Sequence, residues 1–265
     1  MKKEQSKEYQ KYLNRQKGVT IGITAIQIGI LILFVVLWQV LTDAKVMDSF
    51  IVSSPKKMYE VLVTLISGGE LWHHVWTTLY ETILSFLLST IIGTIVAIVL
   101  WFSATLRRVI EPYLVVLNAL PKIALGPLII IWAGTGKSAI VTMAVLISVV
   151  ITALNMLVGF CQTEQNKILL MQTFQANKAQ IFFKLVFPAN IPTLLATLKI
   201  NVGMSWVGTI TGEYLVSKEG LGYLIVYGSQ VFRLDLVMTC TIVLCMLAGA
   251  MYGLVALLER SVKFD

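Results

Sequence analysis

The sequence predicts an all-α membrane protein with six transmembrane helices. Of its 265 residues, 57% are apolar and only 13% are charged, and its mean hydropathy is +0.82. Charged residues normally make up about a quarter of a soluble domain, so this composition disfavours a water-soluble enzyme. A helix needs about 20 apolar residues to cross a bilayer, and the apolar runs are enough for about six such helices. Little sequence then remains for a separate soluble domain.

The first three apolar runs lie in the N-terminal half. Residues 1–18 are basic, and they are too long and too polar for a cleaved signal peptide, so we expect a retained cytoplasmic tail. The first run spans Val19 to Leu41, and a polar stretch from Thr42 to Trp72 follows, which should lie outside the membrane core. The second run covers Val75 to Phe102, and the third covers Tyr113 to Trp132.

The C-terminal half contains the other three runs and one large loop. The fourth run covers Ala139 to Phe160, the fifth Ile191 to Ile210, and the sixth Leu236 to Leu258. Residues 161–187 are too polar to cross a membrane. Because neither repeats nor low-complexity tracts are evident, we expect a single transmembrane domain over residues 19–265.

The distribution of basic residues predicts the orientation in the membrane. Six alternating crossings place thirteen Lys and Arg residues on one side and six on the other, which puts both termini in the cytoplasm of a multi-pass cell (inner) membrane protein. The net charge of +7 arises at the ends of apolar runs, so it does not indicate nucleic-acid binding. The three cysteines lack the spacing of a metal site or a disulfide framework. We expect no bound metal.

The loop at 161–187 is patterned as two short helices. Its apolar residues recur at helical spacing on both sides of a break at 175–177, so each helix should expose an apolar face. One interpretation is an amphipathic hairpin on the membrane surface. The other is a docking helix that inserts into a groove of a cytoplasmic subunit and transmits its movement. The apolar positions are Leu169, Leu170, Phe174, Ile181, Phe182 and Leu185.

The third run should be kinked or broken, because Pro121 and Pro127 each remove a backbone donor and clash with the preceding turn. Such a helix either lines a cavity or has its kink absorbed by neighbouring helices. Lys122 lies near the middle of this apolar run, where a charge is costly unless it faces a partner or water. It either attracts an anionic solute or serves the structure, by snorkelling or by pairing with Glu81 or Glu213.

Polar residues form a stripe on one face of the fifth run, which either lines a pathway or serves helix packing. Packing is the alternative because Gly203, Ser205 and Gly208 are small residues of the kind that bring membrane helices together. Glu213 lies near the outer end, where it either caps the loop with Lys218 and Glu219 or forms part of a gate. The candidate lining residues are Asn201, Ser205, Trp206 and Thr209, with Asn118 facing them.

Two motifs suggest a phosphate-binding loop and a metal site, but neither fits the required pattern. The GTGKS turn at Gly134–Ser138 fails the P-loop pattern, because position 131, where glycine is required, is Ile131. His73 and His74 are adjacent and point in different directions on a helix, which makes a poor metal site and favours an interfacial pair. Neither a catalytic triad nor a metal cluster is evident, so the sequence does not indicate an enzyme.

The large loop resembles the cytoplasmic loop of binding-protein-dependent ABC importer permeases. That loop reads Glu-Ala-Ala, three residues, Gly, nine residues, then Ile-x-Leu-Pro. With Pro188 aligned, Leu169–Met171 fall at Glu-Ala-Ala and Gln175 falls at the Gly. Because this departs from the family pattern, we expect Asn177 to supply the turn that Gly supplies elsewhere. The coupling residues expected from the resemblance are Leu169, Leu170, Met171, Phe174, Gln175, Ala176, Asn177 and Pro188.

A wider resemblance, from about Ile51 to Glu259, is to the nitrate/sulfonate/taurine branch of these permeases. It rests on two segments, VSSPKKMYEVLVTLISGGELWHHVWTTLYET and LNALPKIALGPLIIIWAGTG. The matching residues are Pro121, Ala124, Pro127, Leu128, Trp132, Gly134, Gly136, Asn155, Gly159, Trp206, Glu213, Gly220 and Gly222. The pathway residues expected in total are Asn118, Pro121, Lys122, Pro127, Asn155, Asn201, Ser205, Trp206, Thr209 and Glu213.

The resemblance implies a type I ABC importer permease that forms the pathway for a small solute by alternating access. The solute would be an anion such as a sulfonate, taurine or nitrate, or a vitamin precursor such as a pyrimidine. The implied partners are a second permease copy, two cytoplasmic ATPase subunits docked at 166–186 and an extracytoplasmic binding protein. ATP and Mg²⁺ would bind the ATPases, with no cofactor on this chain. The alternatives are a stand-alone secondary transporter or channel and, third, an intramembrane enzyme.

Overall fold

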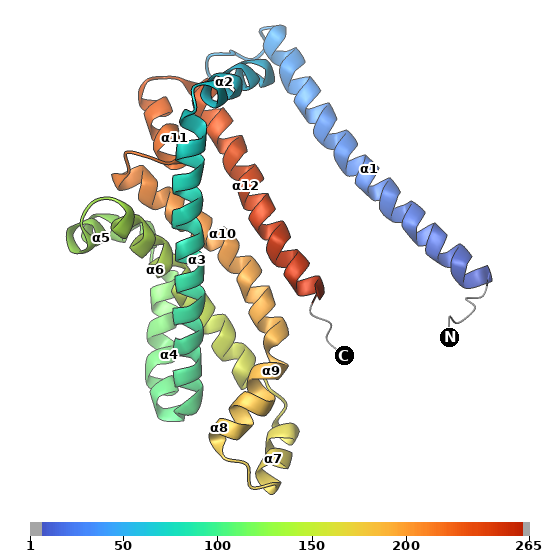
Figure 1. The fold of residues 1–265 in the computed structure, drawn as a ribbon, viewed down its shortest axis with the longest axis vertical. Coiled ribbons are helices and arrows are strands. Elements are labelled where there is room, and N and C mark those ends of the chain that lie inside the picture. Colours follow the sequence, from blue (N-terminus) through green and yellow to red (C-terminus); the bar gives the residue numbers. More distant parts are fainter. Residues whose placement is uncertain (1–6, 262–265) are drawn as a thin grey trace.

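A computed structural model describes residues 7–261, and every regular element in that range is helical (Figure 1). The N-terminal elements are α1 (Lys7–Asp43), α2 (Pro55–Ser67), α3 (Glu70–Phe102), α4 (Ala104–Ala119), the 3-10 turn η1 (Lys122–Leu125), α5 (Gly126–Ala133) and α6 (Lys137–Cys161). The C-terminal elements are α7 (Gln165–Thr173), α8 (Lys178–Ile181), the π-helical turn η2 (Phe182–Val186), α9 (Phe187–Ala189), α10 (Ile191–Val216), α11 (Leu221–Gln230) and α12 (Leu234–Ser261).

The number of spans agrees with the sequence. Four helices are long and apolar enough to cross a membrane, and the number rises to six if each of two bent pairs counts as one span. The pair of α4 with the η1–α5 segment is bent by 91°, which confirms the break expected in the third apolar run. The second pair joins the α8–α9 segment to α10 with a bend of 59°.

The centre of the bundle is formed by α3, α6 and α10. Small residues let these helices approach closely: a Cβ on Gly208 of α10 would overlap Ala144 of α6, and one on Gly93 of α3 would lie 2.5 Å from the Cβ of Thr152. Packing therefore explains Gly208. A Cβ added to Gly203, another of the small residues expected to serve packing, would meet no atom within 4 Å in this chain.

Helix α1 lies apart from the bundle and contacts it near α2 (Figure 1). Many of its apolar side chains are exposed, and those of Ile30 and Phe34 are more than 60% exposed. The helix begins before the apolar run at Val19, so residues 7–18 of the expected tail are helical; the polar residues there are mostly good helix formers. Residues 1–6 of the expected tail, and Lys263 at the basic C-terminal end, lie outside the described residues.

Two helices were not expected from the sequence. Helix α2 forms inside the polar stretch, where the Ser54 side chain accepts a hydrogen bond from the Lys57 N–H and Pro55 occupies the first turn. Helix α11 follows α10 as a short helix that packs beside α12. Both termini of the described chain point toward the end of the bundle that carries α7 and α8, as an even number of crossings requires (Figure 1).

Candidate functional site

The loop at 161–187 forms a hairpin of α7 and α8, as the sequence predicted, but its turn is made differently. Gln175, at the position of the family's glycine, adopts the left-handed conformation with φ of 58°. Asn177 has φ of −75° and caps α8 instead: its side chain accepts from the Gln180 N–H at 2.8 Å, and the Gln180 side chain accepts from the Asn177 N–H. The expectation that Asn177 supplies the left-handed turn is therefore wrong.

Gln175→Gly should stabilise the hairpin modestly. The left-handed conformation costs a residue with a Cβ about 1–2 kcal/mol, and glycine removes this strain. Glycine also raises the conformational entropy of the unfolded chain, which offsets part of the gain. We expect a net gain of at most about 1 kcal/mol, measured as a small rise in melting temperature with transport unchanged. Gln172→Gly, inside α7, is the control and should destabilise the helix by about 1 kcal/mol. A lower melting temperature for Gln175→Gly would contradict the strain argument.

The two halves of the hairpin have different apolar faces. In α7, Leu169 and Leu170 are exposed, and Phe174, which follows the helix as its C-cap, is 74% exposed. In the second half, Ile181 and Phe182 are buried at 4% and 0% exposure. The prediction of an exposed face is thus confirmed for α7 and wrong for α8 and η2, because those residues pack against the bundle.

Phe182 anchors the hairpin in the bundle. Its ring centroid lies between 5.0 and 5.3 Å from those of Trp101 and Phe102, at the end of α3, and of Phe160, at the end of α6. Aromatic pairs at these distances add stabilisation beyond their area burial. The hairpin is therefore packed directly against the ends of α3 and α6.

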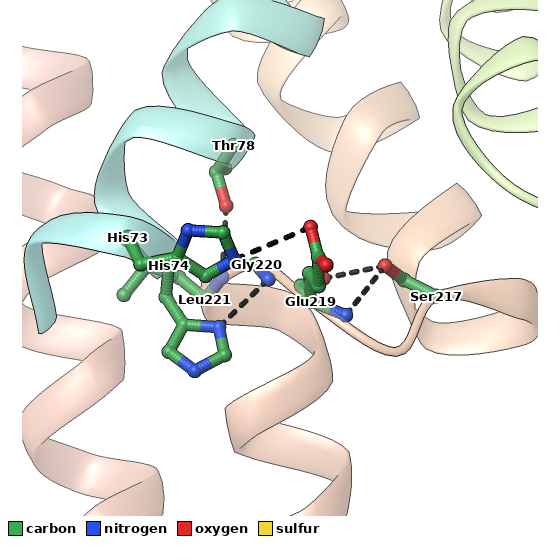
Figure 2. A network of polar contacts seen from close by, with 7 residues as sticks. All are labelled: His73, His74, Thr78, Ser217, Glu219, Gly220 and Leu221. Atoms are coloured by element: carbon green, nitrogen blue, oxygen red, sulfur yellow. Dashed lines mark hydrogen bonds and ion pairs between the residues drawn. The ribbon is translucent and has the colours of Figure 1, made fainter. Parts of the chain in front are cut away.

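At the opposite end of the bundle, α3 and α10 hold the start of α11. The first N–H groups of a helix have no partner within the helix. Here His74 Nδ1 accepts from the Gly220 N–H at 2.9 Å and Thr78 Oγ1 from the Leu221 N–H at 2.8 Å (Figure 2). Glu213 Oε2 accepts from the Gly222 N–H at 2.5 Å. We call His74, Thr78 and Glu213 the outer clamp.

The outer clamp explains several residues singled out in the sequence. Glu213 caps α11 rather than the loop residues Lys218 and Glu219, which corrects one of the two roles expected for it. Glu219 is within 3.4 Å of His73 instead, and its backbone N–H and C=O both bond the Ser217 hydroxyl (Figure 2). His73 and His74 thus serve different contacts. No group of three or more metal-ligating side chains occurs within residues 7–261.

The broken third span places Lys122 against α6. Its Nζ donates to Asn118 Oδ1 and to the Ile147 carbonyl, each at 3.3 Å. No ion pair involves Lys122 within residues 7–261, so the expected alternative of pairing with Glu81 or Glu213 does not occur. Asn118 and Pro121 are exposed on the chain surface at this break, whereas Pro127 is tolerated because it lies in the first turn of α5.

The polar stripe of the fifth run lies inside the chain. Asn201, Ser205, Thr209 and Glu213 are at most 1% exposed. Asn201 Nδ2 donates to Thr152 Oγ1 of α6 at 2.6 Å, and the Ser205 and Ser148 hydroxyls are 3.5 Å apart. Trp206 packs in an apolar cluster, and Asn155 is half-buried. In this conformation these residues line a seam between α3, α6 and α10.

Two contacts between charged residues were not predicted from the sequence. Lys199 of α10 forms an ion pair with Glu259 of α12 at 2.7 Å, although its position in the fifth apolar run marks it as unusual. Glu81 of α3 is fully buried next to Glu213, and a side-chain hydrogen bond joins the two carboxyl groups. The periodicity alone could not show that these pairs meet, because their members are far apart in sequence.

Known proteins resemble this chain over most of its length. A family model described as "binding-protein-dependent transport system inner membrane component" matches residues 89–264. A probable ABC transporter permease of Haemophilus influenzae is 30% identical over 85% of this chain and 90% of that protein. The taurine transport system permease protein of Escherichia coli is 24% identical over 94% of this chain and 90% of that protein.

The fold also matches solved structures. The chain aligns with an inward-facing structure of the MetNI methionine ABC transporter with a TM-score of 0.66 and 18% identity, over 72% of this chain and 95% of that one. At this identity the match establishes the type I importer permease fold. The family model, together with the fold and the multiple apolar spans, leads to one conclusion. The chain belongs to the inner-membrane permease components of binding-protein-dependent ABC transport systems, and it is a transport subunit and not an ATPase.

Proposed function

We propose that two copies of this chain form the pathway of an ATP-driven importer for a small solute, with ATPase subunits docked on the hairpin α7–α8. The observation that carries this proposal is the hairpin itself. It presents Leu169, Leu170 and Phe174 to the cytoplasm, while Phe182 fixes its other half to α3 and α6. An exposed apolar helix on a rigid anchor suits a groove of a moving subunit. A secondary transporter has no use for such a surface.

A second copy is proposed because much of the chain's apolar surface has no partner within it. Helix α1 lies apart from the bundle and contacts α2 (Figure 1). At the break in the third span, Ile131 and Trp132 are each 76% exposed. Lipid covers part of such a surface, but a translocation pathway along the broken helix also needs protein on its opposite side. Homodimerisation supplies that wall with the same residues.

The proposed pathway starts at the break, from the exposed residues Asn118 and Pro121 and the half-buried Lys122. Lys122 has no carboxylate partner, which leaves its charge available to an anionic group. The buried seam lined by Asn201, Ser205 and Thr209 would open only when α10 moves against α3 and α6. Relatives are named for taurine, aliphatic sulfonates and formylaminopyrimidine, so we propose a sulfonate, another small anion or a vitamin precursor as the solute.

The proposal is tested with the purified complex in lipid. The chain is co-expressed with its neighbouring ATPase, and ATP hydrolysis is measured with and without the neighbouring binding protein loaded from a panel of sulfonates, nitrate and pyrimidine precursors. Stimulation by one loaded binding protein would support the importer and identify its solute. Failure of any ATPase to co-purify, with solute moved by this chain alone down an ion gradient, would favour the secondary transporter.

Phe174→Glu should separate docking from folding. The side chain is 74% exposed, so the substitution leaves the bundle intact but places a charge in the proposed apolar interface. We expect co-purified ATPase and ATP-driven uptake to fall at least about tenfold, which corresponds to about 1.4 kcal/mol, at normal membrane expression. Thr105→Glu adds the same charge at an exposed cytoplasmic position in the first turn of α4 and should leave both unchanged. Normal uptake by Phe174→Glu would refute the docking surface.

A further inference from the structure

We propose that Glu81 and Glu213 form a proton-binding site at the outer end of the bundle, where the shared proton locks α3 to α10. The lock goes beyond the importer function proposed above and can fail without it. Glu81 lies on α3 and Glu213 on α10, and both side chains are at most 1% exposed. A side-chain hydrogen bond joins the two carboxyl groups. The pair is therefore a direct polar link between two of the three central helices.

The hydrogen bond between Glu81 and Glu213 requires a proton. Ionised carboxylates only accept hydrogen bonds, so one of the two groups must carry the O–H that donates. Two buried carboxylates in contact would also repel each other, which is why carboxyl pairs of this kind hold one proton between them. No Lys or Arg forms an ion pair with either group within residues 7–261, so no fixed cation replaces that proton.

The contacts of the pair indicate which group holds the proton. Glu213 Oε2 accepts from the Gly222 N–H, and the Thr78 hydroxyl also hydrogen-bonds Glu213. Donors of this kind favour an ionised carboxylate. Among the described residues, no N–H group donates to Glu81. Glu81 therefore carries the proton and donates it to the charged carboxylate of Glu213.

A pocket gives this proton a route to the outer solvent. The pocket has a volume of about 340 Å³, and the residues that line it include Glu81, Gly136 and Lys137 at the start of α6, and Ser217 and Lys218 after α10. The two lysines are exposed, so the pocket reaches the surface. When the lock opens, the O–H bond of Glu81 breaks, the proton passes to solvent water, and both carboxyl groups are left with a negative charge. Repulsion between these charges then favours separation of α3 from α10.

Other titratable groups surround the pair and its pocket. Lys137 attracts a negative charge on Glu81, whereas Glu219 repels it. His74 responds to acid, because protonation turns its Nδ1 into a donor and removes the bond from the Gly220 N–H. The groups contributed by α3, α6, α10, α11 and the loop before α11 are His74, Lys137, Tyr214, Lys218, Glu219 and Tyr223. Between about pH 7 and pH 9, histidine stays largely neutral while lysine and tyrosine keep their protons.

The first test follows the melting temperature of the purified chain in lipid across this range. The folded pair holds a proton that separated carboxyl groups release to water, so its stabilisation is present at the lower pH and is lost as the pH rises. We expect the wild type to lose at least about 3 °C. Glu81→Gln keeps an N–H donor for Glu213 but has no proton to lose, so its melting temperature should vary little. Glu111→Gln removes an exposed carboxyl group on α4 and should behave like the wild type.

An infrared measurement on the wild type keeps the test decisive if Glu81→Gln does not fold. A protonated carboxyl group has a C=O stretching band that an ionised carboxylate lacks, and exposed carboxyl groups are ionised at neutral pH. We expect the folded chain to show this band at neutral pH and to lose it as the pH rises. Absence of the band, or the same pH dependence of melting in Glu81→Gln and the wild type, would overturn the proton-binding site.

The lock also predicts that uptake depends on the pH of the outer side, measured with the permease–ATPase complex in proteoliposomes. Without the proton, two charges hold α3 and α10 apart, and the outer end no longer closes. Wild-type uptake should fall at least about threefold as the outer pH rises, whereas Glu81→Gln should show no such fall. Wild-type uptake that is independent of pH would refute the link between the lock and transport. Failure of the importer proposal would instead abolish uptake at every pH, and the melting and infrared results would still decide the site.

Discussion

Phe182→Ala is expected to abolish ATP-driven uptake and to destabilise the cytoplasmic end of the bundle. The ring is fully buried among Trp101, Phe102 and Phe160, so its removal leaves a cavity that costs about 3–5 kcal/mol in a closely packed site. The hairpin would then lose its rigid link to α3 and α6. ATP hydrolysis should persist in whatever complex assembles, while solute uptake per ATP falls toward zero.

Phe183 provides a matched control for this prediction. It is the next residue of η2, but its side chain is 63% exposed. Phe183→Ala should therefore retain uptake per ATP and change the melting temperature little, because an exposed ring leaves no cavity. Solute uptake per ATP hydrolysed is measured for both variants in proteoliposomes. The comparison shows whether Phe182 transmits movement from the hairpin or only stabilises the fold. Equal uptake per ATP in the two variants would show that Phe182 does not transmit the movement.

Gly222→Ala should disrupt the outer clamp and stop transport. A Cβ at this position would lie 2.7 Å from Glu213 Oε2, the atom that accepts the Gly222 N–H. The helix α11 would have to shift away, leaving a buried carboxylate without its donor. Loss of such a charge-assisted hydrogen bond costs about 1.5–3 kcal/mol, before the strain of the overlap is counted. We expect uptake to fall at least about tenfold, which corresponds to a rise of about 1.4 kcal/mol in the activation free energy of transport.

The control for Gly222→Ala is Gly203→Ala. Gly203 lies on α10, and a Cβ there would meet nothing within 4 Å in the chain. Alanine is the better helix former, so this variant should be neutral or slightly more stable. Uptake by each variant is compared at equal membrane expression, together with its melting temperature. Wild-type uptake by Gly222→Ala would mean that the clamp is not needed for transport.

Local patterns in the sequence predicted most of the fold. The length of the apolar runs predicted the membrane-spanning helices, and Pro121 predicted the break in the third span. The helical spacing of apolar residues in 161–187 predicted the hairpin. These features depend on residues close in sequence, which is why they can be read without tertiary structure. Helix α2 also has a local signal in the sequence, because Ser54 is an N-cap residue and Pro55 follows it. The length of apolar runs alone does not reveal this signal.

Contacts between distant residues could not be predicted in this way. Spacing placed Ile181 and Phe182 on an apolar face, but only the approach of α3 and α6 decided that this face is buried. Gln175, and not Asn177, adopts the left-handed conformation, because Asn177 has an extended backbone and caps α8. Backbone propensity is weak, and the stronger local hydrogen bonds overrode it.

The sequence by itself predicted an all-helical membrane protein with six apolar runs and a two-helix hairpin in the loop at 161–187. It did so because the bilayer demands long apolar helices and because the hairpin's spacing is local. Only the tertiary structure decided which charges meet. Glu81 lies beside Glu213, Glu213 caps α11, and Lys122 bonds α6 with no carboxylate partner. These pairings depend on how three helices pack, and packing is set by close contacts such as that of Gly208 with Ala144.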